Sequence, residues 1–476
     1  MSEGSQNATC MDSIKSDNRN SGDESDTNKC VKLQLDDHIS AYLNKTHIEP
    51  KSEQNNLSEL LVQKVFLNYI IVKQILSNLP WQDKLLCKEV CKTWHSAMQS
   101  LKKEQLSPED FALDLRFKSN KASVKLKLSG KLYNEPLVVM IFTNSAGFCL
   151  TSFCNKIQPP TCSEPCNKEH ALLDMVHKFS SAPKDCLNIM KCEYLSYMPL
   201  PHSITYKHYI THLKPLPFMG GLYIPAIPDV KYHTLDLRTY ASMKRCYYDY
   251  VNKLTKDRIV KGVLVFVTDK YLLHPVEDII FINYLKDVQP DHPYALGGCI
   301  IEDTIFQESY LNDIIDGVNN KETFVSENLI SMGFFTVPKS NPENEHNFSM
   351  YSLVIPASDI VKTKIQDNIN EFAKRVPQFE HSVALKLSCI GRDQKHTYEQ
   401  NCFRAAFPNT RIVGCYGNGE LGHNYPEKPQ KDTVSDLVKR QRLDCHCHNQ
   451  FDIIYSYSTV FVYIGWGKVT SLKTKQ

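Results

Sequence analysis

A glycine-rich run, Gly417 to Gly422 (GNGELG), is one of the few patterns in the chain that could do chemistry. Its glycines fit G-x-G-x-x-G, but the surrounding residues do not predict the strand–helix–strand unit and downstream acid that a dinucleotide site requires. The run also lacks the Gly-Lys-Ser/Thr ending of a P-loop. A tight turn that needs positive φ is the favoured interpretation. In an alternative interpretation, ligand or peptide contacts come from Gly417, Asn418, Gly419 and Glu420.

Cys389 is a second candidate, because it ends an expected strand and stands three residues before Arg392. A guanidinium beside a thiol favours the thiolate, so the pair could react with or bind a ligand. The competing interpretation, a small apolar side chain buried at a strand end, is favoured. No His or Asp stands in a triad order with Cys389, so we predict no catalytic residue.

Metal-ligand residue types gather in two segments. Residues 445–448 read Cys-His-Cys-His, with Cys402 and Cys415 as candidate neighbours, and Cys162 and Cys166 lie in a proline-rich segment. Neither segment shows a C-x-x-C pair or an H-x(3–5)-H spacing that completes a tetrahedral ligand set. We therefore predict no metal ion and no cofactor.

Composition limits the class of protein. The 476 residues are 42% apolar and 23% charged with a net charge of +2, typical of a chain with two or three globular domains. A dedicated nucleic-acid protein normally carries a strongly basic domain, so we expect no nucleic-acid partner. No apolar run approaches about 18 residues and no secretory signal opens the chain, so we expect no membrane contact. The 17 cysteines are expected to be reduced thiols in the cytoplasm and nucleus.

The most strongly patterned stretch runs from Val65 to Leu101 and predicts two or three short amphipathic helices. Apolar residues recur at near-helical spacing up to Leu79, and Pro80 begins a new turn, where its missing N–H costs nothing. Asp83 lies early in the next helix, where the helix dipole favours a carboxylate. So short a stretch cannot bury both faces of its helices, which leaves apolar surface for a partner.

After a polar joint at 102–110, strands alternate with helices. Strands are expected at 111–117, 123–128, 137–143, 187–194, 221–224, 232–237, 262–268, 294–301, 328–337, 350–355, 382–389, 411–416 and 451–466, with 221–224 and 232–237 as a pair. Helices are expected at 170–179, 279–288, 358–376 and 398–407. Gly297 and Gly298 predict a close approach to a neighbouring strand.

These patterns predict an α+β or mixed α/β fold, in which a small all-helical N-terminal module precedes two mixed α/β lobes. The expected divisions are a disordered region 1–56, the helical module 57–101, lobes at 111–310 and 320–466, and a tail at 467–476. Residues 424–450 are expected to be a long polar excursion.

The helical stretch resembles an F-box. The shared residues are I-L-x-x-L-P (Ile75, Leu76, Leu79, Pro80), D-x-L-L (Asp83, Leu85, Leu86) and V-C-K-x-W (Val90, Cys91, Lys92, Trp94). Val65 and Phe66 stand where the family usually has Leu-Pro. An ordinary helical hairpin is the alternative interpretation. The resemblance implies docking to the Skp-type adaptor of a cullin–RING ubiquitin ligase through Ile75, Leu79, Pro80, Leu85, Leu86, Val90 and Trp94.

Four later motifs occur in the order of a FIST C-terminal domain: SCIGR (388–392), FRAAFP (403–408), IVGCYGNGELG (412–422) and YSYSTV (455–460). Residues 187–301 more faintly resemble a FIST N-terminal region. An F-box joined to FIST lobes is the arrangement of the F-box only protein 22-like family. Over residues 60–466 the chain resembles this family, as a divergent relative would. This resemblance implies a non-catalytic SCF subunit whose FIST lobes capture protein substrates for ubiquitination and proteasomal degradation. Because FIST lobes in bacteria are proposed ligand sensors, a small-ligand sensor is the alternative.

Overall fold

The computed structural model describes residues 62–118, 121–149, 151–158, 162, 166–192, 194–198, 219–306, 325–342, 346–359, 361–427 and 453–470. The expected disordered region 1–56 and the Cys-His-Cys-His run at 445–448 lie outside the described residues, as does most of the polar excursion. The chain divides into two compact units, Met1–Val72 and Lys73–Gln476. Within the described ranges, every helix is too short or too polar to cross a membrane.

The first helical stretch is interrupted at Asn68. Residues 62–67 are helical, and a new helix, α3 (Tyr69–Ser77), begins after Asn68. The Asn68 side-chain oxygen accepts hydrogen bonds from the backbone N–H groups of Ile70 and Ile71 at 3.0 and 3.3 Å. This is the bonding of an N-cap residue. The near-helical spacing of apolar residues from Val65 to Leu79 therefore spans two helices rather than one.

Two short helices open the second unit after Pro80. Helix α4 (Trp81–Cys87) begins directly after Pro80, whose φ is −64°, and carries Asp83 in its first turn. Helix α5 (Lys92–Glu104) continues past Leu101, where the sequence predicts a polar joint. Its last turn contains Lys102 and Lys103. The helix dipole favours cations at this end, which accounts for the extension of the helix through polar residues.

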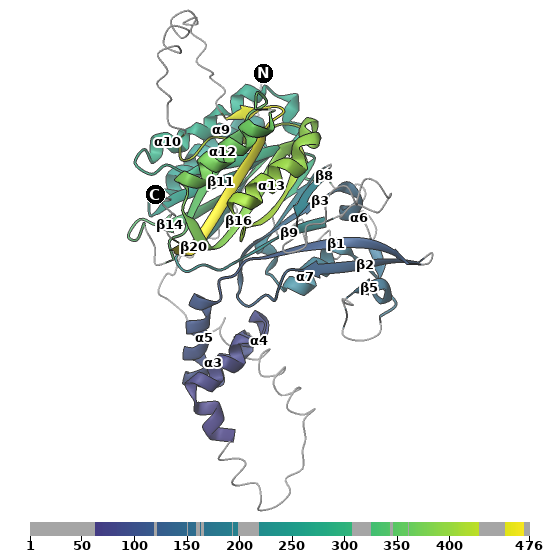
Figure 1. Ribbon diagram of the computed structural model, residues 1–476, viewed down its shortest axis with the longest axis vertical. Coiled ribbons are helices and arrows are strands. Elements are labelled where there is room, and N and C mark those ends of the chain that lie inside the picture. The colour runs from purple at the N-terminus through teal and green to yellow at the C-terminus, as the bar shows by residue number, and fades with distance from the viewer. Residues whose placement is uncertain are drawn as a thin grey trace, which may run out of the picture. The chain divides into compact units, whose positions relative to one another are not determined.

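The described strands of the second unit form three large sheets (Figure 1). The first sheet has the order β13-β7-β3-β9-β1-β2-β5. Its strands are β1 (Glu109–Lys118), β2 (Lys121–Leu128), β3 (Pro136–Thr143), β5 (Ile157–Gln158), β7 (Leu187–Lys191), β9 (Met219–Pro225) and β13 (Asp303–Ile305). Helix α7 (Leu172–Ser180) covers one face through Leu172 and Val176. A small separate sheet pairs β4 (Thr151–Phe153) with β6 (Glu169–Ala171).

The other two sheets contain strands from both expected lobes. The second sheet has the order β10-β14-β11-β12-β18-β19 and the third has the order β15-β20-β16-β17-β8. The strands of the second sheet are β10 (Lys231–Leu237), β11 (Arg258–Thr268), β12 (Ala295–Ile301), β14 (Ile330–Pro338), β18 (Glu420–Gly422) and β19 (Ile454–Tyr455). Those of the third are β8 (Tyr194–Met198), β15 (Ser349–Ile355), β16 (Gln378–Cys389), β17 (Arg411–Gly417) and β20 (Thr459–Thr470).

These two sheets pack face to face between helices. Leu264 and Phe266 of β11 share a buried cluster with Leu385 of β16. The alternate side chains of β11, such as Val263 and Val265, instead join the cluster that contains α9 (Tyr240–Leu254) and α10 (Tyr284–Val288). Helices α12 (Lys362–Arg375) and α13 (His396–Ala406) cover the outer face of the third sheet. Successive residues of a strand point to opposite faces, so a strand buried on both sides needs the continuous apolar run that β11 has.

The mixed α+β fold class predicted from the sequence is confirmed, and several details differ. Strands β9 and β10, expected to pair, belong to different sheets. Helix α9 was not predicted, and residues 276–283 form a 3₁₀ helix, η4 (Val276–Asn283), before α10. Strand β14 lies between β10 and β11, and β8 pairs with β17. The expected boundary at 310–320 therefore does not separate the sheets. Strand β20 also extends to Thr470, into the expected tail.

The close approach predicted from Gly297 and Gly298 is present. Strands β11 and β12 are parallel, with Val265 opposite Gly298. A Cβ atom on Gly298 would lie 1.8 Å from the backbone oxygen of Val265. Only glycine fits this position, because backbone on the neighbouring strand cannot move aside as a flexible side chain can.

Candidate functional site

The first candidate site is the apolar surface of the α3–α5 segment. Ile75 is 37% exposed, Leu86 is 54% exposed and Val90 is 62% exposed. The other predicted adaptor contacts Leu79, Pro80 and Leu85 are half-buried. Trp94 is only 7% exposed, so its indole packs inward and offers little surface to an adaptor. The spacing of apolar residues in the sequence shows which face of a helix is apolar. Which of those side chains pack against the rest of the protein depends on tertiary contacts.

Polar contacts attach helix α4 to α7 and to the loop between β2 and β3. The indole N–H of Trp81 donates to the backbone oxygen of Ser180 at 3.1 Å. The Lys84 ammonium donates to the backbone oxygen of Tyr133 at 2.9 Å and to the side-chain oxygen of Gln105. Burial lowers the pKa of Lys84 to about 8. Because a buried ammonium is unfavourable without such partners, these contacts restrict how α4 can sit on the sheet.

The glycine-rich run is a packed turn. Asn418 N–H donates to the backbone oxygen of Ile300 at 2.9 Å, and Ile300 N–H donates to Gly419 O at the same distance. Gly419 has a φ of +150°, and a Cβ on Gly417 would lie 2.4 Å from Ile300 O. The turn needing positive φ is therefore confirmed. It leads into β18 rather than a helix, and the Asn418 N–H that a phosphate would need is already bonded to β12.

Cys389 and Arg392 do not form a reactive pair. The guanidinium of Arg392 donates to Glu399 Oε1 at 2.6 Å and to the backbone oxygen of Tyr457 at 2.9 Å. Burial, together with the nearby charge of Glu420, raises the pKa of the Cys389 thiol. This environment disfavours the thiolate and agrees with the favoured interpretation of Cys389 as a small side chain buried at the end of β16.

Glu420 belongs to the same buried network. Its Oε2 accepts hydrogen bonds from the backbone N–H and hydroxyl of Ser458 at 3.1 and 2.6 Å. Burial raises its pKa to about 8, although the Ser458 hydrogen bonds act in the opposite direction. Lys386, also fully buried, lies 3.8 Å from Glu399 Oε2, and burial lowers its pKa to about 8. Glu399 is therefore the carboxylate that lies against the buried Arg392 and Lys386.

The predicted ligand-binding residues are therefore only partly brought together. Cys389, Arg392 and Glu420 meet in the buried network, whereas Asn418 is exposed, with its amide 3.5 Å from Asp269 Oδ1. None of them lines the polar groove of about 350 Å³ that the second unit forms elsewhere. That groove is lined by Ser107, Pro108, Ser129, Glu380, His381, Ser382, Pro408, Asn409 and Arg411. No local motif marks its residues, because they come from distant segments.

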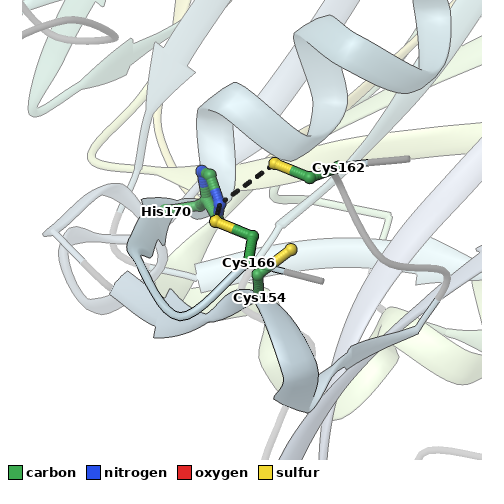
Figure 2. A group of neighbouring side chains, drawn as sticks. All are labelled: Cys154, Cys162, Cys166 and His170. Carbon is green, nitrogen blue, oxygen red and sulfur yellow. Dashed lines mark hydrogen bonds between the residues drawn. The ribbon is translucent and has the colours of Figure 1, made fainter. Parts of the chain in front are cut away.

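Four side chains that commonly bind metals form another candidate centre. The ligand atoms of Cys154, Cys162, Cys166 and His170 all lie within 4.8 Å of one another (Figure 2). No metal is expected here from Cys162 and Cys166 alone. The two further ligand types, Cys154 and His170, come from flanking segments, and the C-x₃-C-x₃-H spacing that ends at His170 is the sequence signal for them.

No protein-family model and no curated protein matches the chain. A solved structure that matches is the crystal structure of cyanuric acid hydrolase from A. caulinodans, at 8% sequence identity and a TM-score of 0.26. The match covers 71% of this chain and 92% of that chain.

We withdraw the expectation of a non-catalytic subunit, since the matched protein is a hydrolase and nothing in the comparisons supports a chain without activity. At this identity and TM-score the match carries no argument for an activity of the present chain.

Proposed function

We propose that the chain is the substrate-recognition subunit of an SCF (Skp–cullin–F-box) E3 ubiquitin ligase. The α3–α5 segment docks the Skp-type adaptor, and the FIST-like sheets capture protein substrates for ubiquitination and proteasomal degradation. The proposed location is the cytoplasm and nucleus, in keeping with 17 cysteines expected to be reduced.

The observation that carries this proposal is the exposure of Ile75, Leu86 and Val90 in the stretch that resembles an F-box. Exposure of these large apolar side chains to water is unfavourable. A partner surface that buried them would therefore bind with a favourable hydrophobic free energy. Each belongs to one of the motifs that carry the F-box resemblance. Exposure and motif position therefore favour the same interaction.

The attachment of α4 supports the proposal in a second way. A ligase subunit of this kind contributes proximity, so the geometry between adaptor and substrate must be maintained. The contacts of Trp81 with Ser180 and of Lys84 with Tyr133 join α4 directly to the part of the chain that holds the sheets. An adaptor bound on α4 would accordingly be oriented relative to a substrate bound on the sheets.

The test compares adaptor binding by the full chain and by two variants. Leu86→Ala combined with Val90→Ala removes two exposed side chains, each worth about 1–2 kcal/mol in a well-packed interface. We expect co-purified Skp-type adaptor and cullin to fall at least about tenfold. The matched control is Leu273→Ala on η3 (Asp269–Leu273), where Leu273 is 87% exposed and outside the F-box-like stretch.

Thermal unfolding establishes that both variants are folded before binding is compared. Equal adaptor recovery from the double variant and the control would refute the proposed docking surface. Partners that the double variant retains are candidate substrates.

A further inference from the structure

We propose that Cys154, Cys162, Cys166 and His170 bind a zinc ion that joins Cys162 and Cys166 to the ends of the β4–β6 strand pair. Cys154 follows β4 in a short 3₁₀ helix, η1 (Cys154–Lys156), and His170 lies in β6. Figure 2 shows the three sulfur atoms and the imidazole turned toward a common centre. This inference is independent of the proposed ligase function.

The distances match a tetrahedral zinc site. His170 Nε2 lies 3.5 Å from Cys162 Sγ and 3.6 Å from Cys166 Sγ. Zinc bonds of about 2.3 Å to sulfur and 2.0–2.1 Å to nitrogen, at tetrahedral angles, separate these two ligand types by about 3.5–3.6 Å. Both separations from His170 Nε2 are therefore those that bound zinc requires, and every other pair of ligand atoms lies within 4.8 Å.

The hydrogen bonding of His170 favours a metal over thiol hydrogen bonds alone. Its Nδ1 lies 3.2 Å from Asp174 Oδ2, and this partner places the ring proton on Nδ1. Nε2 then has one lone pair, which can accept a hydrogen bond from one thiol but not from both Cys162 and Cys166. A zinc ion on that lone pair accounts for both sulfur contacts. A histidine that binds zinc through one nitrogen and a carboxylate through the other is a recurrent arrangement.

Local backbone structure holds Cys154, Cys166 and His170 in place. Ser152 lies opposite His170 in the β4–β6 pair, and Cys154 N–H donates to the backbone oxygen of Lys168 at 3.1 Å. Lys168 N–H in turn donates to Cys166 Sγ at 3.4 Å. This contact fixes the position of the Cys166 sulfur beside the strand pair.

The ligand set points to structural zinc. Thiolates are soft ligands that favour zinc over magnesium or calcium, and Cys₃His is a closed four-ligand set. Cys162 and Cys166 have C-x₃-C spacing, within the range usual for such sites. β4 and β6 are only three residues long, so a metal would supply cohesion that so short a strand pair lacks.

The first test measures metal in the full chain purified without chelators. We expect about one zinc per chain by elemental analysis, and thiolate-to-cobalt charge-transfer and tetrahedral d–d bands after replacement with Co²⁺. Zinc below about one-tenth of an equivalent without a cobalt spectrum, or iron in place of zinc, would overturn the proposal.

The second test uses variants. Cys166→Ser is expected to lose the zinc and the cobalt bands, whereas Cys246→Ser, which removes a half-buried cysteine of α9 outside the cluster, retains both. Asp174→Asn keeps all four ligands and changes only the partner of His170. It therefore tests the site even if Cys166→Ser fails to fold. Its zinc affinity should fall about 10–100-fold in competition with a chromophoric chelator. Full zinc content in folded Cys166→Ser, or unchanged affinity in Asp174→Asn, would overturn the assignment.

Discussion

The Nε atom of Arg392 lies 2.6 Å from Oε1 of Glu399, and both side chains are buried. Glu399 Oε2 also accepts a hydrogen bond from the Thr459 hydroxyl at 2.7 Å and lies 3.8 Å from Lys386 Nζ. The pair connects η6 (Ile390–Lys395) and α13 to β16 and β20. The guanidinium therefore serves the fold, since its charge is directed at Glu399 rather than at Cys389.

Glu399→Gln should be strongly destabilising. The amide retains an acceptor but leaves the charges of Arg392 and Lys386 buried without their carboxylate, a change that costs about 3–5 kcal/mol. The control is Glu371→Gln, which breaks an exposed pair with Lys374 at 3.3 Å. An exposed pair contributes about 0–1 kcal/mol. Urea unfolding measures both, and equal losses of free energy would contradict the role given to the buried pair.

Glu420 makes stability depend on pH. Its pKa of about 8 in the folded protein exceeds its ordinary value of 4.5, so the folded state holds this proton more tightly than the unfolded state. The stabilisation that protonated Glu420 gives the folded state is fully present below pH 4.5 and is lost as the pH rises toward 8. Glu420→Gln keeps an acceptor for Ser458 and removes the titration.

We therefore expect the wild-type protein to lose stability relative to Glu420→Gln across this window, by on the order of a few kcal/mol at most. Urea unfolding near the two ends of the window measures the difference. Glu427→Gln, at an exposed position, should follow the wild type. Parallel pH curves for the wild type and Glu420→Gln would disprove the effect.

Trp94 and Val90 should behave differently although both belong to the V-C-K-x-W motif. Trp94→Ala empties a buried site and is expected to cost about 3–5 kcal/mol of folding free energy. Val90→Ala changes an exposed side chain and should shift stability by no more than about 0.5 kcal/mol. Thermal unfolding distinguishes them. A small loss for Trp94→Ala would mean that its indole is available to a partner after all.

Two cysteines should differ in reactivity. The pKa of Cys91 is lowered because the backbone N–H of Trp94, at the start of α5, favours the thiolate. The pKa of Cys389 is raised by burial. We expect iodoacetamide to alkylate Cys91 in the native protein and Cys389 only after denaturation, as measured by peptide mass spectrometry. Faster native labelling of Cys389 than of Cys91 would contradict the environments described above.

Residue patterns along the chain were sufficient to predict the fold class and most of its elements. The continuous apolar run at 262–268 predicts the buried strand β11, and the pair Gly297 and Gly298 predicts a close backbone approach, because both depend on local sequence. Helix α9 was missed, although Met243, Tyr247 and Val251 recur every four residues on its buried face. That signal was available and a helix could have been predicted from it.

Tertiary contacts decided the rest. Strands β9 and β10 are close in sequence but enter different sheets, because pairing partners depend on packing far along the chain. In the same way Trp94 packs inward while Leu86 stays exposed. The side chains of Cys154 and His170 meet only because β4 pairs with β6. Periodicity specifies which face of a helix or strand is apolar. The residues that contact this face, or that complete a set of metal ligands, lie far away in the sequence and are brought close only by the fold.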